Sequence, residues 1–395
     1  MALAGIVLTV PGAMLQARPS LKLERVVVLM RHGVRAPLNG EVPEATRTAA
    51  PWPRWPVEES RLTDHGATAL AMLGRFDRRM LAARGLIAAR GCPAAGQVRI
   101  HTNTADRTIT SGAAFARGFA PACGLTIDHL PSGKTDPIFE PLAAGATRFD
   151  AAAAIVAIER YTGGVDALAR RHRAALARLD AVLGCGLPTG CSPVVPSRVT
   201  AAADGRGVSL SGPIRDASGT AQVLLLQYAQ GLPRDQVGWG RADAATIRQV
   251  GAVHAALFDV FTRSPYMAAH QSAVFGRHML DTLTAQAGPR FDLLMGHDTN
   301  VTALGAALGV DLNAPGYATN DVAPGGALVF ERLYDRARGR RYVRVSYQAQ
   351  PLAALRSLSG GVAVQRLHIP GCGAGTLCDL STFDRLLRSR LAPLR

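Results

Sequence analysis

The segment Arg31–Pro37, which reads RHGVRAP, combines the residue types that phosphoryl transfer requires. An arginine fork pairs with two phosphate oxygens and stays charged at any working pH. An imidazole held between two such forks can attack phosphorus and form a phosphohistidine. We therefore predict that His32 is a nucleophile and that Arg31 and Arg35 hold the oxygens of a phosphate group.

A second segment, Gly296–Asn300 or GHDTN, could complete this chemistry. The leaving oxygen of a phosphomonoester needs a proton, which a carboxylic acid can deliver. Asp298 is placed for that role, His297 could donate a hydrogen bond to a phosphate oxygen, and Thr299 is a further candidate for substrate binding. Taken alone, the segment would equally suit the start of a helix. Its combination with RHGVRAP favours catalysis.

A third segment, ADRT, contains Arg107, which would supply a third cation. Three arginines provide the positive charge that phosphate needs, so we expect neither a metal nor a cofactor. The remaining histidines do not form a cluster with metal-ligand spacing. The patterns GxSxG and GxxxxGK[ST] do not occur in the sequence.

The elements around these segments predict an α/β fold. The apolar runs RVVVLM and FDLLM directly precede RHGVRAP and GHDTN, as strands buried on both faces precede functional loops. A long block with helical periodicity separates them, broken at SGPIRDASGT, and a hairpin follows near the C-terminus. We expect a mostly parallel sheet flanked by helices in residues 22–145 and 265–395. An all-helical cap domain would occupy residues 146–264.

Composition limits the partners of the chain. The 395 residues have a net charge of +15, and Lys22 and Lys134 are the only lysines. Biased base composition explains an excess of arginine as well as attraction of an anionic substrate does. The arginines are dispersed and aromatic residues make up only 5%, so we expect no nucleic-acid partner. No apolar run suits a membrane span. The sequence does not indicate an oligomeric state.

The N-terminus and the cysteines point to an exported protein. Residues 1–21 begin with an apolar stretch followed by small residues, as in a secretory signal, although a basic start is missing. Six cysteines allow fifteen disulfide pairings. Their spacing forms three local pairs, and none lies in a CxxC arrangement. We therefore expect a periplasmic or secreted location. The cysteine pairs are Cys92 with Cys123, Cys185 with Cys191, and Cys372 with Cys378.

With these motifs the sequence resembles the histidine acid phosphatases, in particular the bacterial periplasmic phytase and glucose-1-phosphatase branch. The resemblance extends from about residue 24 to the C-terminus. Besides the three segments above, it includes LTDHGA, DPIFEPL, GWGR and PGGALVFER. It implies a phosphoglycerate mutase-like fold with a helical cap, a disulfide in each local cysteine pair, and the roles proposed above for the site residues. It also implies hydrolysis of phytate or sugar phosphates, favoured at acid pH.

Two positions depart from the phytases of this branch. Asn39 stands where they carry a lysine, and Gln222 replaces an acidic residue that faces the substrate from the cap. Both departures concern the substrate and leave the phosphate-cleaving residues in place. Glucose-1-phosphatase specificity is therefore an alternative to phytase specificity.

Two other functions remain open. A phosphoglycerate mutase-like transferase shares the RHG core, but it lacks the second Arg-x-Pro and the GHDTN segment. A non-catalytic binder of phosphorylated sugars or polyanions would need neither a nucleophile nor a proton donor, and this chain has both.

Overall fold

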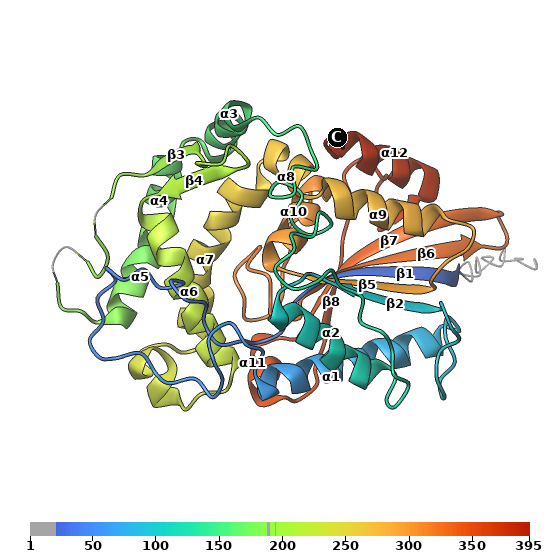
Figure 1. The fold of residues 1–395 in the computed structure, drawn as a ribbon, viewed down its shortest axis with the longest axis horizontal. Helices are drawn as coiled ribbons and strands as arrows, with labels where there is room; N and C mark the ends of the chain where they lie inside the picture. Colours follow the sequence, from blue (N-terminus) through green and yellow to red (C-terminus); the bar gives the residue numbers. More distant parts are fainter. Residues whose placement is uncertain (1–20, 188–189, 194) are drawn as a thin grey trace, which may run out of the picture.

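The computed structural model describes residues 21–187, 190–193 and 195–395. It contains a large mixed sheet flanked by helices, with a second group of helices to one side of it (Figure 1). The signal-like segment of residues 1–21 lies, except for Leu21, outside the described residues. No described helix has the length and the apolar composition that a membrane span requires.

The order of strands in the sheet is β2-β5-β1-β6-β7-β8, and β9 also pairs with β7. Strand β1 runs parallel to β5, with Val28 opposite Leu293, and β5 runs parallel to β2. The remaining pairings are antiparallel, so the sheet is mixed around a parallel core. They include the predicted hairpin near the C-terminus, which β6 and β7 form. The strands are β1 (Leu21–Arg31), β2 (Val98–Thr102), β5 (Phe291–Gly296), β6 (Ala327–Asp335), β7 (Arg340–Ala349), β8 (Ala363–Arg366) and β9 (Leu377–Asp379).

Helices cover both faces of this sheet, which explains why β1 and β5 are apolar on both sides. On one face, α1 and α2 pack so closely that a Cβ atom at Gly118 would collide with the backbone of Ala71. On the other face, α9 and α10 contact β1 and α12 contacts β7 (Figure 1). These helices are α1 (Asp64–Ala83), α2 (Asp106–Phe119), α9 (Ala273–Thr284), α10 (Asp298–Leu308) and α12 (Leu380–Arg390).

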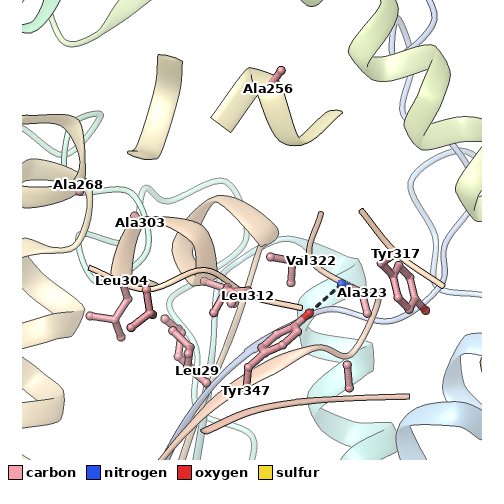
Figure 2. Close-up of a cluster of buried hydrophobic side chains, with 14 of the residues drawn as sticks. Leu29, Ala256, Ala268, Ala303, Leu304, Leu312, Tyr317, Val322, Ala323 and Tyr347 are labelled. Atoms are coloured by element: carbon pink, nitrogen blue, oxygen red, sulfur yellow. Dashed lines mark hydrogen bonds between the residues drawn. The ribbon is translucent and has the colours of Figure 1, made fainter. Parts of the chain in front are cut away.

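The core beside α10 connects the sheet to the loop after that helix. Leu29 of β1, Leu304 of α10 and Tyr347 of β7 are all buried there (Figure 2). The hydroxyl of Tyr347 accepts a hydrogen bond from the backbone N–H of Ala323 at 3.0 Å. The loop that contains Ala323 is thereby fixed against the sheet. A short helix, α11 (Leu352–Ser357), follows β7.

The segment between the two parts of the sheet is mainly helical, as expected, but it is not all-helical. A two-stranded antiparallel sheet lies within it, formed by β3 (Arg198–Ala201) and β4 (Val208–Ser211). The strands are too short to show a clear alternation in the sequence. The helical elements are α3 (Ala151–Thr162), α4 (Val165–Arg171), α5 (Arg173–Leu183), α6 (Pro213–Ala229), η1 (Arg234–Gly240), α7 (Ala244–Phe258), η2 (Asp259–Arg263) and α8 (Pro265–Gln271).

The predicted break at SGPIRDASGT is wrong, because most of it forms the first half of α6. Pro213 begins this helix, where its missing N–H costs no hydrogen bond. The small residues that resemble a turn serve packing instead. A Cβ atom at Gly219 would collide with the carbonyl oxygen of Glu41.

All three local cysteine pairs form disulfides in the structure. They join Cys92 to Cys123, Cys185 to Cys191, and Cys372 to Cys378. The proposed division into residues 22–145 with 265–395 and a cap at 146–264 stays a prediction.

Candidate active site

The three predicted segments meet at one edge of the sheet. The parallel strands β1, β5 and β2 end there, and their following residues include His32, His297 and Arg107. The ring centroids of His32 and His297 are 5.5 Å apart. Arg107 Nη2 lies 3.5 Å from His297 Nδ1. Parallel strands bring their carboxyl ends together in this way, so distant parts of the chain share one site.

His32 is held as a neutral base. Its side chain is buried, and its Nδ1 lies 2.9 Å from the carbonyl oxygen of Gly33. A carbonyl only accepts, so Nδ1 carries the hydrogen and Nε2 keeps its lone pair. Burial, and then the charges of Arg31, Arg35 and other cations, lower the pKa of His32 well below its usual value. The Nε2 lone pair is therefore available even at acid pH.

Three arginines surround His32, and each has a buried Nε with no hydrogen-bond partner among the described residues. They are Arg31, Arg35 and Arg107. A buried donor without a partner is costly, and four arginines outside the site, Arg25, Arg263, Arg277 and Arg332, also have one. The three in the site differ in that they lie around one imidazole. Three such donors around one imidazole suit an anion that binds all of them.

Arg31 is fixed on two sides. It is fully buried, one Nη donates to the carbonyl oxygen of Val322, and Nη2 lies 2.9 Å from Asp298 Oδ2. Val322 precedes Ala323, which Tyr347 holds against the sheet. Figure 2 shows the hydroxyl of Tyr347 bonded to Ala323, next to Val322. This hydroxyl in the core therefore helps to set the position of the Arg31 guanidinium.

Arg35 is fixed by Glu41, a residue that sequence reasoning missed. Arg35 Nη1 donates to Glu41 Oε2 at 2.7 Å, and Nη2 donates to Oε1 at 2.8 Å. Glu41 Oε2 also accepts the backbone N–H of Leu38 at 2.7 Å. Nothing in the local sequence distinguishes Glu41 from the exposed Glu44, so only the folded loop could reveal this pair.

Asp298 begins α10 and is ionised in the free protein. Burial alone would raise its pKa, but Arg31, His254, His297 and Arg35 outweigh it and lower the pKa to about 2. This value matters for the predicted role of Asp298 as a proton donor. The carboxylate must first acquire a proton in the complex with a ligand.

His297 is also neutral and has protein partners at both ring nitrogens. Its Nε2 lies 3.1 Å from Asn103 Oδ1, and its Nδ1 faces Arg107. Burial, followed by the charge of Arg107, lowers its pKa to about 3, against the opposing influence of Asp298. Asn103 is another residue that sequence reasoning missed, although it directly follows β2 at the same sheet edge.

Gly33 of RHGVRAP packs against the two helices beneath the loop. Its backbone N–H donates to Ser111 Oγ at 3.1 Å, and a Cβ atom would lie 2.7 Å from Leu70 Cδ1. The glycine therefore lets the loop pack on α1 and α2. Thr299, the further candidate for substrate binding, is exposed. It lines a cleft together with Arg107 and His297.

The chain matches the family described as "Histidine phosphatase superfamily (branch 2)" over residues 22–158 and 239–348. It belongs to this superfamily. The resemblance inferred from the motifs is thereby confirmed.

Curated relatives of this phosphatase match it over nearly its whole length. It is 33% identical to Phytase AppA of Escherichia coli strain K12 over 98% of this chain and 96% of the relative. It is 28% identical to a Glucose-1-phosphatase of Salmonella typhimurium strain LT2 over 98% of this chain and 97% of the relative. The chain is thus a histidine acid phosphatase that resembles phytases and glucose-1-phosphatases.

A solved structure confirms the fold. The Hafnia alvei phytase in complex with myo-inositol hexakis sulphate has a TM-score of 0.85 and 32% identity, covering 95% of this chain and 99% of that one. At the two departures noted above, this phosphatase has an exposed Asn39 and a buried Gln222. The amide nitrogen and oxygen of Gln222 have no hydrogen-bond partner among the described residues.

Proposed function

We propose that this phosphatase hydrolyses phosphomonoesters through a phosphohistidine on His32. One observation carries the proposal. Buried Nε donors of Arg31 and Arg35, from one segment, and of Arg107, from another, surround the neutral imidazole of His32 without partners among the described residues. Such donors stabilise the charge of a transferring phosphoryl group.

In the first step, Nε2 of His32 attacks phosphorus and the bond between phosphorus and the ester oxygen breaks. The three arginines hold the phosphoryl oxygens, and Asp298 gives a proton to the departing oxygen, which leaves as an alcohol. In the second step, water attacks the phosphohistidine while Asp298 takes up a proton. Inorganic phosphate forms and His32 is restored.

The proton on Asp298 arrives with the substrate. The pKa of Asp298 is about 2 in the free protein, so its carboxylate is ionised in mildly acidic solution. A phosphomonoester keeps one proton below a pH of about 6. Binding such a monoanion beside Asp298 supplies the proton and offsets the charges that hold the pKa down. Because the monoanion prevails at acid pH, we expect activity to be favoured there.

The binding of phosphate would also change His297. Negative charge next to Arg107 weakens the cause that lowers the pKa of His297. His297 would then take a proton on Nδ1 and donate it in a hydrogen bond to a phosphoryl oxygen. Thr299, on the same cleft, would contact the rest of the substrate.

The substrate class that we propose is phosphorylated polyols and sugars, as the names of the relatives indicate. The neutral Asn39 and Gln222 leave glucose-1-phosphatase specificity as the alternative to phytase specificity. We also propose a periplasmic or secreted location, which the three disulfides support, because disulfides persist in oxidising compartments.

Trapping the phosphohistidine tests the mechanism. The protein is mixed with a phosphomonoester labelled on phosphorus and quenched in alkali, which preserves phosphohistidine. We expect label on the wild type and on the control His129→Ala, whose histidine is exposed and outside the site. His32→Ala should carry no label and lose turnover of p-nitrophenyl phosphate by about a thousandfold or more. Binding without turnover in the wild type would favour the non-catalytic binder instead.

A further inference from the structure

Two residues of the phosphate site, Arg107 and His297, also line a larger cleft. This cleft has a volume of about 530 Å³ and is lined by Arg107, His297 and Thr299 on the side of the sheet. Its volume is in the range of sites that hold whole small molecules. The cleft therefore has room for the leaving group of the substrate as well as for one phosphoryl group.

Another part of the cleft wall comes from the turn between β3 and β4. Ala202, Asp204, Arg206 and Gly207 of this turn all line it. The turn is held by its own hydrogen bonds, since the N–H of Ala202 donates to Gly207 O and the N–H of Arg206 donates to Asp204 Oδ1, each at 2.9 Å. Residues of this turn can thus present a fixed surface to a ligand.

Arg206 is the cation on this wall. Its Nη1 donates to the carbonyl oxygen of Ala143, another residue that lines the cleft, at 2.8 Å. A guanidinium has five N–H donors, so this contact orients the side chain and leaves donors for a ligand. The side chain is exposed, and so it can be reached from solution.

Two carboxylates also line the cleft, and both have partners in the protein. Asp204 accepts the N–H of Arg206, and Glu140 accepts the Nδ2 of Asn103 at 3.1 Å. The cleft has cationic side chains at two places, Arg107 at the phosphate site and Arg206 on the turn between β3 and β4.

We propose that Arg206 is a specificity-determining residue that binds a second phosphate group of a polyphosphorylated polyol. The inference rests on the proposed function and adds to it the class of substrate. A monophosphorylated substrate places its one phosphate at His32 and offers nothing anionic to Arg206. A polyol with phosphates around its ring contacts both cationic side chains at once, and charge-assisted hydrogen bonds are strong enough to set a preference.

The kinetic test compares the wild type with Arg206→Gln and Arg206→Lys on phytate and on p-nitrophenyl phosphate. For Arg206→Gln we expect KM for phytate to rise about tenfold and kcat/KM for p-nitrophenyl phosphate to stay within about twofold. Arg206→Lys keeps the charge and should recover part of the loss. Arg198→Gln, on the exposed side of β3, is the matched control and should change neither substrate.

A binding test separates this inference from the mechanism. Calorimetry with myo-inositol hexakis sulphate and with inorganic phosphate needs no turnover. We expect Arg206→Gln to weaken binding of the hexakis sulphate about tenfold and to leave phosphate binding unchanged. An equal loss for both ligands would show that Arg206 only fixes the turn to Ala143 and would overturn the proposal. So would unchanged hexakis sulphate binding, or a wild type that hydrolyses p-nitrophenyl phosphate but not phytate. Absence of phosphohistidine would instead overturn the mechanism, whatever the binding result.

Discussion

Glu41 accepts hydrogen bonds from both Nη atoms of Arg35, and the two side chains are almost fully enclosed, with 8% and 5% of their surfaces exposed. The carboxylate of Glu41 thus binds the two terminal nitrogens of the guanidinium. The Nε of Arg35 has no partner among the described residues. Glu41 thus fixes the direction in which Arg35 presents its remaining donors to the ring of His32.

Weakening this pair should reduce catalysis. Glu41→Gln keeps the shape of the side chain but removes its charge and one acceptor for Arg35. A hydrogen bond to a charged group contributes about 1.5–3 kcal/mol, so we expect kcat/KM to fall about tenfold or more. Glu44→Gln, an exposed change on the same loop, is the control. Equal rates for wild type and a correctly folded Glu41→Gln would show that Glu41 does not position Arg35.

The ionised Asp298 should make stability depend on pH. Its pKa is about 2 in the folded protein and 3.8 ordinarily, so the carboxylate stabilises the fold above a pH of about 4. This contribution is lost as the pH falls toward 2. We expect the advantage of wild type over Asp298→Asn in free energy of unfolding to shrink by about 1 kcal/mol between pH 5 and pH 3. Urea unfolding at both pH values measures it, and a gap that stays constant would contradict the low pKa.

The hydroxyl of Tyr347 should affect catalysis from within the core. Tyr347→Phe leaves the backbone N–H of Ala323 without its partner, which costs about 1–3 kcal/mol of stability. The loop that holds Arg31 through Val322 is loosened, so we expect kcat to fall more than KM rises. Thermal unfolding and steady-state kinetics test both effects. Tyr342→Phe, at a partly exposed position of the same strand, should change neither.

Removal of metals should leave activity unchanged. In the proposed mechanism three guanidinium groups supply the positive charge at the phosphate, and the nucleophile is an imidazole, not a metal-bound water. We expect the same kcat and KM on p-nitrophenyl phosphate after dialysis against excess EDTA. Complete loss of activity, restored by a divalent cation, would contradict the mechanism.

Sequence reasoning found the residues whose type and spacing are typical of one kind of chemistry. RHGVRAP after an apolar strand identified Arg31, His32 and Arg35, and the structure places them together. It did not find Glu41, Asn103 or Ser111, which are ordinary residue types in loops and helices. Their importance lies in the partner that each one meets, and those partners lie up to 194 positions away.

The sequence also misjudged elements that are defined by packing. SGPIRDASGT has the residues of a turn, yet most of it forms the first half of α6. Gly219 lets this helix approach the loop of Glu41. The hairpin of β3 and β4 was missed because four residues are too few for a periodic signal. Tertiary contacts override local preference in both places.

The order of residues along the chain was enough to predict the chemistry of this protein, because the proposed nucleophile, the proposed proton donor and three arginines each follow or begin an element with a clear pattern. Only the tertiary structure decided the protonation state, the orientation and the partners of those groups. The ionised state of Asp298, the tautomer of His32, the pairing of Arg35 with Glu41 and the position of Arg206 all depend on burial and on distances between remote segments, which no local pattern encodes.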